Sequence, residues 1–486
     1  MDLLLTHGYQ LEEDPAEKYP YPPLGILYLS SHLKQHGLEV DVFDTTFARP
    51  TDFARLLAEA APPIVGISAN LKTRGNVLAM TRRAKEQGAL VVLGGPEPYS
   101  YSEEYLARGA DVVVGGEGEL TLQELVPHLL QRGLGDLDQV PGIAFRAPGG
   151  ATVRTDARDP IADLDAQPFP DRGAIDIGRY QETWRRERGQ SAISLITARG
   201  CAYRCAWCSH SVFGFSHRRR SPVNVADEVT SIVESYDPDM LWYADDVFTV
   251  HHRWLSEYAD ELEQRGLRLP FEAISREDRL DEETVRRLAD MGCFRLWVGA
   301  ESGSQRILDA MGRRTSAERM HEVIAMLKRH GIEAGTFIML GYEGETEADI
   351  AATVDYLKNA APDTYLTTVA YPIKGTEYYR QVADRVVSSK SWEEGSDRDL
   401  TVAGRRSRLY YRFAIRWLVS EVALSREQGY GPRSLRRRLV AFLNAAVGRL
   451  GMLLTRHQVE PGRRGPGDPA PPSEPIAVPT QARTGP

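Results

Sequence analysis

The chain has 486 residues, enough for two or three domains that each bury a hydrophobic core. Its formal net charge of −9 argues against broad nucleic-acid binding, so nucleic acid is not expected as a partner. Its apolar residues form no run of about 18 or more, so no membrane-spanning segment is expected. No basic residue stands ahead of the apolar stretch that follows Met1, so no export signal is expected and a cytoplasmic location is predicted.

Residues 1–135 alternate short apolar runs with helical patterns, which is typical of a doubly wound, Rossmann-like α/β sheet. Strands are predicted at Asp2–Thr6, Leu38–Phe43, Ile64–Ser68, Leu90–Leu93 and Asp111–Val114, and helices at Leu24–His36, Thr73–Gln87 and Leu120–Gln131. Ligands of such sheets bind at the carboxyl ends of the strands. Strand-end turns rich in glycine also occur where nothing binds. The candidate ligand-binding residues at these ends are Leu24, Ser68, Asn70, Leu71, Gly94, Gly95, Pro96, Glu97, Gly115, Gly116 and Glu117.

Residues 136–190 break this pattern with prolines and glycines and are predicted to form an interdomain linker with a hairpin, Ile143–Arg146 against Thr152–Arg154. Residues 191–385 begin a second βα series that predicts a partial (β/α)6 TIM-like barrel. Residues 386–459 are predicted to form a helical C-terminal region, and residues 460–486 a disordered tail. The six barrel strands are expected at Ile193–Thr197, Met240–Ala244, Phe271–Ser275, Phe294–Val298, Gly335–Met339 and Tyr365–Ala370.

Three of the four cysteines lie within eight residues, in the run Cys201-Ala-Tyr-Arg-Cys205-Ala-Trp-Cys208. Structural zinc sites and thiolate-only ferredoxin sites each use four protein ligands. An iron-sulfur cubane held by three cysteines keeps one iron open to a small molecule. A zinc site completed by His210 is the weaker alternative, because His210 follows Cys208 too closely. Cys293, at the start of an apolar strand, is expected to be a core residue.

The Cys-x3-Cys-x2-Cys spacing, with Trp207 before the last cysteine, resembles the signature of the radical SAM superfamily. The resemblance implies that Cys201, Cys205 and Cys208 bind a 4Fe-4S cluster. The open iron of that cluster would chelate S-adenosylmethionine (SAM), which an electron from the cluster would cleave to a 5'-deoxyadenosyl radical. Trp207 would then be a cofactor-binding residue.

The series Pro-Pro-Leu-Gly, Gly-Ile-Ser, Gly-Gly-Pro and Gly-Gly-Glu-Gly-Glu precedes the cysteine motif. This order resembles the cobalamin-binding domain of cobalamin-dependent radical SAM enzymes of the class B methylase type. The strand-end residues named above would then contact cobalamin. The sequence contains no Asp-x-His-x-x-Gly motif, so cobalamin is expected to bind without a histidine below the cobalt.

Polar residues also follow the strands of the second series, and the radical SAM resemblance implies roles for them. The end of the second strand would approach the amino group of SAM, and the end of the fourth its ribose or methionyl part. The fifth and sixth ends would frame the adenine. Helix capping by Asp246 or Glu301, and pairing of Arg276 with a neighbouring acid, are simpler alternatives. The residues concerned are Asp245, Asp246, Ser275, Arg276, Glu301, Ser302, Gly341 and Tyr371.

These resemblances predict methylation of an unactivated carbon in a natural-product or lipid precursor, through a 5'-deoxyadenosyl radical and methylcobalamin. A small-molecule or lipid substrate and a flavodoxin- or ferredoxin-type electron donor are the expected partners. Cyclisation, ring contraction or another rearrangement with the same cofactors is the first alternative. An RNA methylthiolation enzyme would need three further cysteines, and only Cys293 is left. A non-enzymatic corrinoid- or zinc-binding protein is the last alternative.

Arginines alternate with aromatic residues in the C-terminal region, for example in Tyr410-Tyr-Arg-Phe-Ala-Ile-Arg-Trp417. Helices that pack on the barrel and keep their arginines in solvent are the favoured interpretation. Peripheral contact with a membrane is the alternative that this composition leaves open.

Overall fold

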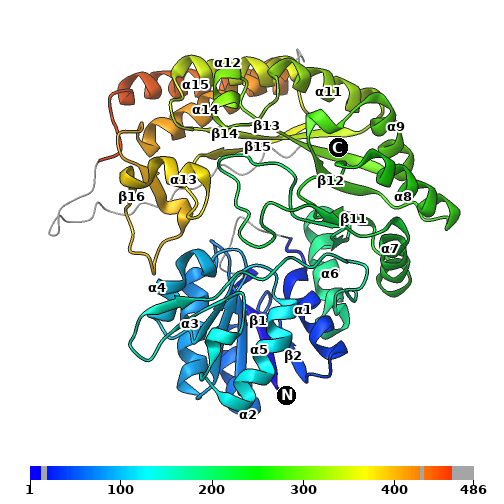
Figure 1. Ribbon diagram of the computed structural model, residues 1–486. Helices are drawn as coiled ribbons and strands as arrows, with labels where there is room; N and C mark the ends of the chain where they lie inside the picture. The colour runs from blue at the N-terminus through cyan, green and yellow to red at the C-terminus, as the bar shows by residue number, and fades with distance from the viewer. Residues whose placement is uncertain (12–18, 427–431, 462–486) are drawn as a thin grey trace.

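The computed structural model describes residues 1–11, 19–426 and 432–461. Two sheets, each with helices along it, lie one below the other in Figure 1, and the C-terminal helices pack on the far side of the upper sheet. The tail predicted at residues 460–486 lies outside the described residues except for Glu460 and Pro461.

The first sheet has seven strands in the order β2-β1-β3-β4-β5-β6-β7, of which β1 to β5 are parallel. Apolar side chains from both faces of these strands form two separate core clusters, as a sheet covered by helices on both sides requires. The predicted doubly wound fold is confirmed. The elements are β1 (Leu3–His7), α1 (Leu24–Gln35), β2 (Val40–Phe43), α2 (Pro50–Ala60), β3 (Ile64–Ser68), α3 (Arg74–Glu86), β4 (Leu90–Gly94), α4 (Ser102–Leu106), β5 (Val112–Val114) and α5 (Glu119–Arg132).

The predicted hairpin is present as β6 (Ile143–Arg146) and β7 (Thr152–Arg154), and β6 pairs antiparallel with β5. The hairpin therefore extends the first sheet and is not part of a linker. The parallel strand β4 pairs with one edge of β5, and β6 satisfies the backbone hydrogen-bonding groups on the other edge. The linker proper leads into α6 (Ile177–Arg188).

That linker is fixed to the second domain by a buried arginine. Arg172 donates to the carbonyl oxygen of Ser194 at 2.9 Å and pairs with the buried Glu228 at 2.7 Å. Arg220 pairs with the other oxygen of Glu228. The Glu228 carboxylate thus joins the linker to the start of the barrel, so the linker packs along the second domain as it crosses between the two.

The second sheet has six parallel strands in the order β15-β14-β13-β12-β11-β8, so the barrel is open between its first and last strands. This confirms the partial barrel predicted from the sequence. Its strands are β8 (Ala192–Leu195), β11 (Met240–Tyr243), β12 (Phe271–Ser275), β13 (Cys293–Glu301), β14 (Glu333–Leu340) and β15 (Thr364–Val369). Its helices are α7 (Pro222–Tyr236), α8 (His252–Gln264), α9 (Glu282–Met291), α10 (Gln305–Ala310), α11 (Ala317–Arg329), α12 (Glu347–Ala360) and α13 (Glu377–Val382). Cys293 is buried at the start of β13, as expected of a core residue.

The C-terminal region begins with an antiparallel ribbon, β16 (Val386–Ser388) and β17 (Leu400–Val402), before the helices α14 (Arg408–Arg426) and α15 (Pro432–Thr455). The predicted helical C-terminal region is confirmed, with a short ribbon ahead of its helices that was not predicted. Three-residue strands are too short to leave a recognisable alternation in the sequence. The helical segment Arg433–Thr455 is also long and apolar enough, by length and composition alone, to cross a membrane. The sequence did not predict this, because it contains no long uninterrupted apolar run.

The loop between β16 and β17 holds the two domains together through Arg74 of α3. Arg74 is 3% exposed; its Nε donates to Glu97 Oε1 at 2.6 Å, and it pairs with Asp397 Oδ1 at 3.1 Å. Tyr101 donates its hydroxyl to the same oxygen of Asp397 at 2.5 Å. The edge-on contact of Trp392 with Tyr105 adds apolar burial to this interdomain clasp.

Candidate active site

The cysteine loop leaves and returns through a two-residue ribbon, β9 (Ala198–Arg199) paired antiparallel with β10 (Arg218–Arg219). Gly200, directly before Cys201, has a φ of +83°, and a Cβ there would overlap the carbonyl oxygen of Ser216. Only glycine fits this close crossing of the two ends of the loop. The turn thus sets the point at which the first cysteine leaves the strand.

The far side of the loop is anchored to two barrel helices. The backbone N–H of Ala206 donates to Met311 O at 3.2 Å, and Ala206 O accepts from the N–H of Tyr378 at 2.8 Å. Trp207 packs against a buried apolar cluster that includes Met311 and Tyr378. Because backbone contacts on both sides hold Ala206, the loop places Cys205 and Cys208 in fixed positions.

Cys201 and Cys205 are half-buried and Cys208 is exposed. Desolvation raises the pKa of the half-buried Cys201 thiol. Within the described ranges, no three His, Cys, Asp or Glu side chains converge as the ligands of one metal ion would. A cubane distributes its cysteines over three iron atoms, so three separated thiols on one loop fit a cluster better than they fit zinc.

A stacked pair of side chains lies beside the second cysteine. The guanidinium of Arg276 lies 3.8 Å from the ring centroid of Tyr203, and its Nη1 is 3.8 Å from Cys205 Sγ. Arg276 also pairs with Asp278 at 2.9 Å, and Arg279 donates to the Tyr203 hydroxyl. Tyr203 was not predicted as a site residue. Its place between the first two cysteines was the only signal available.

Asp245 and Asp246 end the second barrel strand but have different environments. Asp245 is 1% exposed; it accepts hydrogen bonds from the backbone and hydroxyl of Thr197 and pairs with Arg219 at 3.3 Å. Its carboxylate therefore holds the start of the cysteine loop. Asp246 is exposed. Of the two carboxylates, that of Asp245 is occupied by protein groups and that of Asp246 is exposed, and the predicted contact with the amino group of SAM stays a prediction.

Glu301 ends β13 in a strained conformation. Its φ is +62°, and the pairing between β13 and β14 shifts register at this residue. Burial raises the pKa of Glu301 to about 7, against the opposing charge of Arg313. A non-glycine residue with a positive φ is costly and persists where the surrounding structure requires it, often at a functional site. A Cβ at Gly299 would lie 2.7 Å from Glu301 Oε1 and 2.7 Å from Arg313 Nη2, so the buried carboxyl group lies beside β13 near Arg313.

Ser275 and Ser302 are buried and have protein partners. The Ser275 hydroxyl lies 2.5 Å from that of Thr249, and the Ser302 hydroxyl lies 3.2 Å from that of Thr353 and accepts from the N–H of Ser304 at 3.1 Å. Ser302 thereby ties the loop after β13 to α12. The prediction that these two serines contact SAM stays a prediction.

The loop after β14 contacts the C-terminal helices. Gly341 has a φ of +78°, and a Cβ there would come within 2.9 Å of the Tyr411 ring on α14. Its N–H donates to Glu345 Oε2 at 2.6 Å. Tyr371, at the exit of β15, is half-buried. The C-terminal region thus fixes the loop predicted to frame the adenine, and Glu345, which sequence analysis did not select, closes that loop.

The first domain meets the cysteine loop at the ends of its own strands. Ser211 donates its hydroxyl to Pro96 O at 2.6 Å, which joins the turn after β4 to the residues that follow Cys208. A cavity of about 240 Å³ lies between Gly115 and Gly116 on one side and His210 to Gly214 on the other. The predicted cobalamin loops and the cysteine loop therefore lie in direct contact.

The remaining residues predicted to contact cobalamin lie at the same edge of the sheet. Asn70 forms a tight turn in which its side chain accepts from the N–H of Lys72 at 2.9 Å, and this turn carries Leu71, which is half-buried. Leu24 is the first residue of α1. Gly95 has a φ of +98°, and a Cβ there would come within 2.6 Å of Ala69 O, so glycine lets the turns after β3 and β4, at Ser68 and Gly94, pack closely.

Glu97 and Glu117 have buried arginine partners. Glu97 pairs with Arg74 in the clasp, while Glu117 pairs with Arg199 and Arg218 at 2.7 Å each. Glu117 therefore joins the two domains directly, whereas Glu97 holds Arg74, which in turn reaches Asp397. The predicted contact of both carboxylates with cobalamin stays a prediction. His7, at the end of β1, lies 2.9 Å from Asp44 through Nε2, and its Nδ1 accepts from the N–H of Tyr9 at 3.3 Å. That histidine is held inside the first domain.

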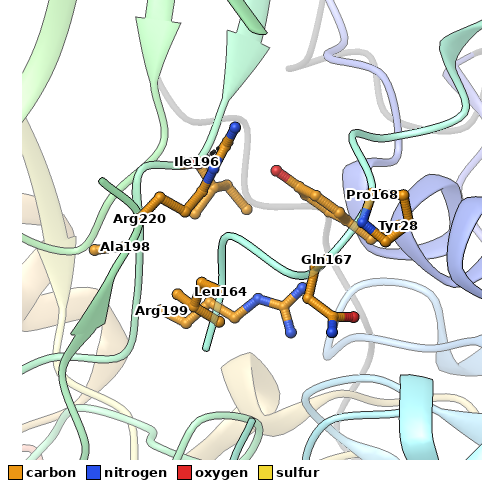
Figure 2. Close-up of a pocket in the computed structure, with 8 residues that line it drawn as sticks. All are labelled: Tyr28, Leu164, Gln167, Pro168, Ile196, Ala198, Arg199 and Arg220. Atoms are coloured by element: carbon orange, nitrogen blue, oxygen red, sulfur yellow. Dashed lines mark hydrogen bonds between the residues drawn. The ribbon is translucent and has the colours of Figure 1, made fainter. Parts of the chain in front are cut away.

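A second, smaller cavity marks the seam between the domains. It has a volume of about 10 Å³, room for about one water molecule. Figure 2 shows Tyr28 of α1 and Gln167 of the linker facing Ile196 and Arg220 of the barrel across it. The seam is thus closely packed at β9, the base of the cysteine loop, and the larger space between the domains lies at the strand ends.

Comparison with known families agrees with this arrangement. The family described as the B12 binding domain matches residues 17–126, and the Radical SAM superfamily matches residues 195–357. Together the two matches span more than half of the chain, in the order of the two domains seen in the structure. The chain belongs to the cobalamin-dependent radical SAM family. Membership implies a 4Fe-4S cluster, SAM and cobalamin as its cofactors.

Solved structures of this family share the fold over nearly the whole chain. The radical SAM methyltransferase TsrM from Kitasatospora setae has a TM-score of 0.69 at 17% identity, covering 94% of this chain and 99% of that one. The cobalamin-dependent radical enzyme OxsB has a TM-score of 0.72 at 18% identity, covering 94% and 72%. At such low identity, these likenesses concern the fold alone.

Two curated relatives differ in the reaction that their names describe. Cytidylyl-2-hydroxyethylphosphonate methyltransferase of Streptomyces wedmorensis is 28% identical, covering 78% of this chain and 81% of its own. Anaerobic magnesium-protoporphyrin IX monomethyl ester cyclase of Rubrivivax gelatinosus is also 28% identical, covering 75% and 67%. Family membership alone therefore does not choose between methyl transfer and cyclisation.

Proposed function

We propose that this family member methylates an unactivated carbon of a small-molecule natural-product or lipid precursor. The observation that carries the proposal is the contact between Ser211 and Pro96, which brings the cysteine loop against the predicted cobalamin loops. Methyl transfer to a substrate radical requires the carbon radical and the methyl donor within a few ångströms of each other. When bound, the cluster supplies the electron that cleaves SAM, and cobalamin carries the methyl group.

The chain's own side chains support this chemistry in distinct ways. The exposed carboxylate of Asp246 can accept hydrogen bonds from the ammonium group of SAM. Glu301, at the end of β13, can accept from a ribose hydroxyl when ionised. Tyr411 of the C-terminal helices packs against Gly341, the residue proposed to frame the adenine, and would close the site on that side. Closure keeps water away from a radical, which would otherwise be lost to side reactions.

Cyclisation or rearrangement is the second candidate, favoured by the likeness to the cyclase of Rubrivivax gelatinosus. The two reactions differ in their use of SAM. Methyl transfer uses two molecules, one that gives up its methyl group and leaves S-adenosylhomocysteine and one that leaves 5'-deoxyadenosine. A rearrangement uses only the second. A flavodoxin- or ferredoxin-type protein is the proposed electron donor for either.

The test uses the full chain, reconstituted anaerobically with iron, sulfide and hydroxocobalamin. Metal analysis of the wild type should give about four irons and one cobalt per chain, and Cys205→Ala should lose the iron while Cys293→Ala keeps it. The loaded enzyme is then given methyl-deuterated SAM and fractionated small-molecule extracts. A product heavier by a deuterated methyl group, with equal yields of S-adenosylhomocysteine and 5'-deoxyadenosine, supports methylation. A product without label, formed with 5'-deoxyadenosine alone, would overturn it in favour of rearrangement.

A further inference from the structure

Helix α15 has one packed face and one bare face. Its packed face includes Ala445 and Met452 and has two glycines, Gly448 and Gly451, where a Cβ would collide with Trp417 and Phe413 of α14. The two helices thus approach closely along one side of α15. Figure 1 shows α15 on the side of the barrel remote from the first domain.

The opposite face of α15 is covered with large apolar side chains. These residues recur every three or four positions, so they lie on one side of the helix. Each is 42–71% exposed, whereas soluble monomers rarely leave a contiguous apolar patch of this kind uncovered. This bare apolar face consists of Leu435, Leu439, Val440, Phe442, Leu443, Val447, Leu450, Leu453 and Leu454.

The two helices are strongly basic in an acidic protein. Within their described bounds they carry nine arginines and one acidic residue, Glu421, while the whole chain has a net charge of −9. Arg436 and Arg438 are exposed in the first turns of α15, and Arg449 is exposed further along the helix. By helical position Arg438 and Arg449 border the apolar face, while Arg436 lies on it in the first turns, from where a long side chain can reach past the apolar residues. Such a face is complementary to a surface with an apolar interior and anionic groups above it.

We propose that the bare apolar face of α15 docks on an anionic lipid surface, with the helix lying in the plane of the interface. A second copy of this chain is a poor occupant, because its α15 offers five arginines and no acidic residue to pair with them. A spanning orientation is also poor, because it would place Arg449 in the hydrocarbon core and strip the packed face from α14. The proposal does not depend on which reaction the enzyme performs.

Vesicle flotation of the full-length protein tests the proposal. The wild type should float with vesicles of phosphatidylcholine and phosphatidylglycerol, bind pure phosphatidylcholine far less, and be released by high salt. Phe442→Ser combined with Leu450→Ser should lower binding at least about tenfold, since two large apolar side chains no longer enter the lipid. Arg436→Gln combined with Arg438→Gln should remove most of the preference for anionic vesicles.

Matched controls use exposed residues elsewhere. Leu134→Ser, just past α5 in the first domain, and Arg253→Gln, on α8, should bind vesicles as the wild type does. Since all of these residues are exposed, the variants should keep the wild-type unfolding temperature, which excludes misfolding as a cause.

Four results would overturn the proposal. The first is no binding to either kind of vesicle, and the second is binding that only detergent reverses, which would indicate a membrane span. The third is a dimer that Phe442→Ser dissociates, which would indicate that a second copy covers the face. The fourth is binding seen only in a chain that ends at residue 461, which would mean that residues 462–486 cover the face.

Discussion

Arg276 Nη1 lies 3.8 Å from Cys205 Sγ while its guanidinium stacks on Tyr203. Arg276 is 3% exposed, so water screens its charge poorly. Reduction adds a negative charge to an iron-sulfur cluster, and a cation held beside one of the thiolates favours that state. The stacked tyrosine keeps the cation in place, while Asp278, 2.9 Å from Nε, and Glu277, 3.6 Å from Nη2, offset part of its charge and leave Nη1 beside the thiolate.

We therefore expect Arg276→Gln to lower the reduction potential of the cluster, on the order of tens of millivolts, and to slow the cleavage of SAM. A redox titration followed by electron paramagnetic resonance measures the potential directly. Arg286→Gln, on the exposed side of α9, is the control and should leave it unchanged. An unaltered potential combined with a loss of iron would instead give Arg276 a purely structural role.

Gly200 and Gly214 provide a matched pair within the cysteine loop. Both have a positive φ, +83° and +60°, but a Cβ at Gly200 would overlap Ser216 O while the space around Gly214 is open. Gly214→Ala should cost only the conformational strain of about 1–2 kcal/mol. Gly200→Ala should in addition force the loop ends apart and reduce the iron bound after reconstitution. Equal iron contents in the two variants would contradict the close crossing at the base of the loop.

The positions of the site loops follow from the sequence because they depend on local periodicity. All five strands predicted in the first domain and all six in the barrel are present, so Ser68, Gly94 and Asp246 occupy the strand ends where they were expected. The ribbon β16–β17 escaped prediction because each of its strands has only three residues. Whether a polar residue at a strand end points to a ligand or to the protein is a different question.

Long-range partners decide that question, and sequence spacing does not report them. Nothing in the sequence distinguishes Asp245 from Asp246. In the structure, however, the Asp245 carboxylate pairs with Arg219 and accepts a hydrogen bond from the N–H of Thr197. Glu97 pairs with Arg74, and Arg74 also pairs with Asp397, which lies 300 residues beyond Glu97 in the sequence. Similarly, α15 has apolar or small residues on two faces, and only the packing of Trp417 shows which one is covered.

Removal of Arg74 should weaken the junction between the domains. Arg74→Met leaves the buried carboxylates of Glu97 and Asp397 without a cation, and breaking a buried pair on one side costs about 3–5 kcal/mol. We expect a lower unfolding temperature and faster proteolysis of the loop that carries Trp392. Arg55→Met, whose exposed side chain pairs with Asp52 at 3.4 Å, should cost less than about 1 kcal/mol. Equal effects in the two variants would contradict a role for the clasp.

Glu345 should make the free energy of unfolding depend on pH, and the direction of that dependence follows from its pKa. Desolvation raises the pKa of Glu345 from 4.5 to about 8, despite the hydrogen bond from the N–H of Gly341. Between these values the folded protein keeps a proton that the unfolded chain has lost, so stability falls as pH rises, by up to about 1.4 kcal/mol per pH unit. Glu345→Gln removes this penalty. Its stability relative to the wild type should therefore increase from pH 5 to pH 8 in denaturant titrations.

Asp349, four residues away at the start of α12, provides a control of opposite sign. Burial opposes its ionisation, but hydrogen bonds from Ser304, Thr346 and Arg306 outweigh it and lower its pKa below 3.8. A carboxylate of this kind stabilises the fold above the unfolded pKa and loses that contribution only as pH falls through the folded value. Asp349→Asn should therefore destabilise the protein by a constant amount from pH 5 to pH 8. If the Glu345→Gln difference is equally flat across that range, Glu345 is ionised in the folded protein and desolvation does not control its titration.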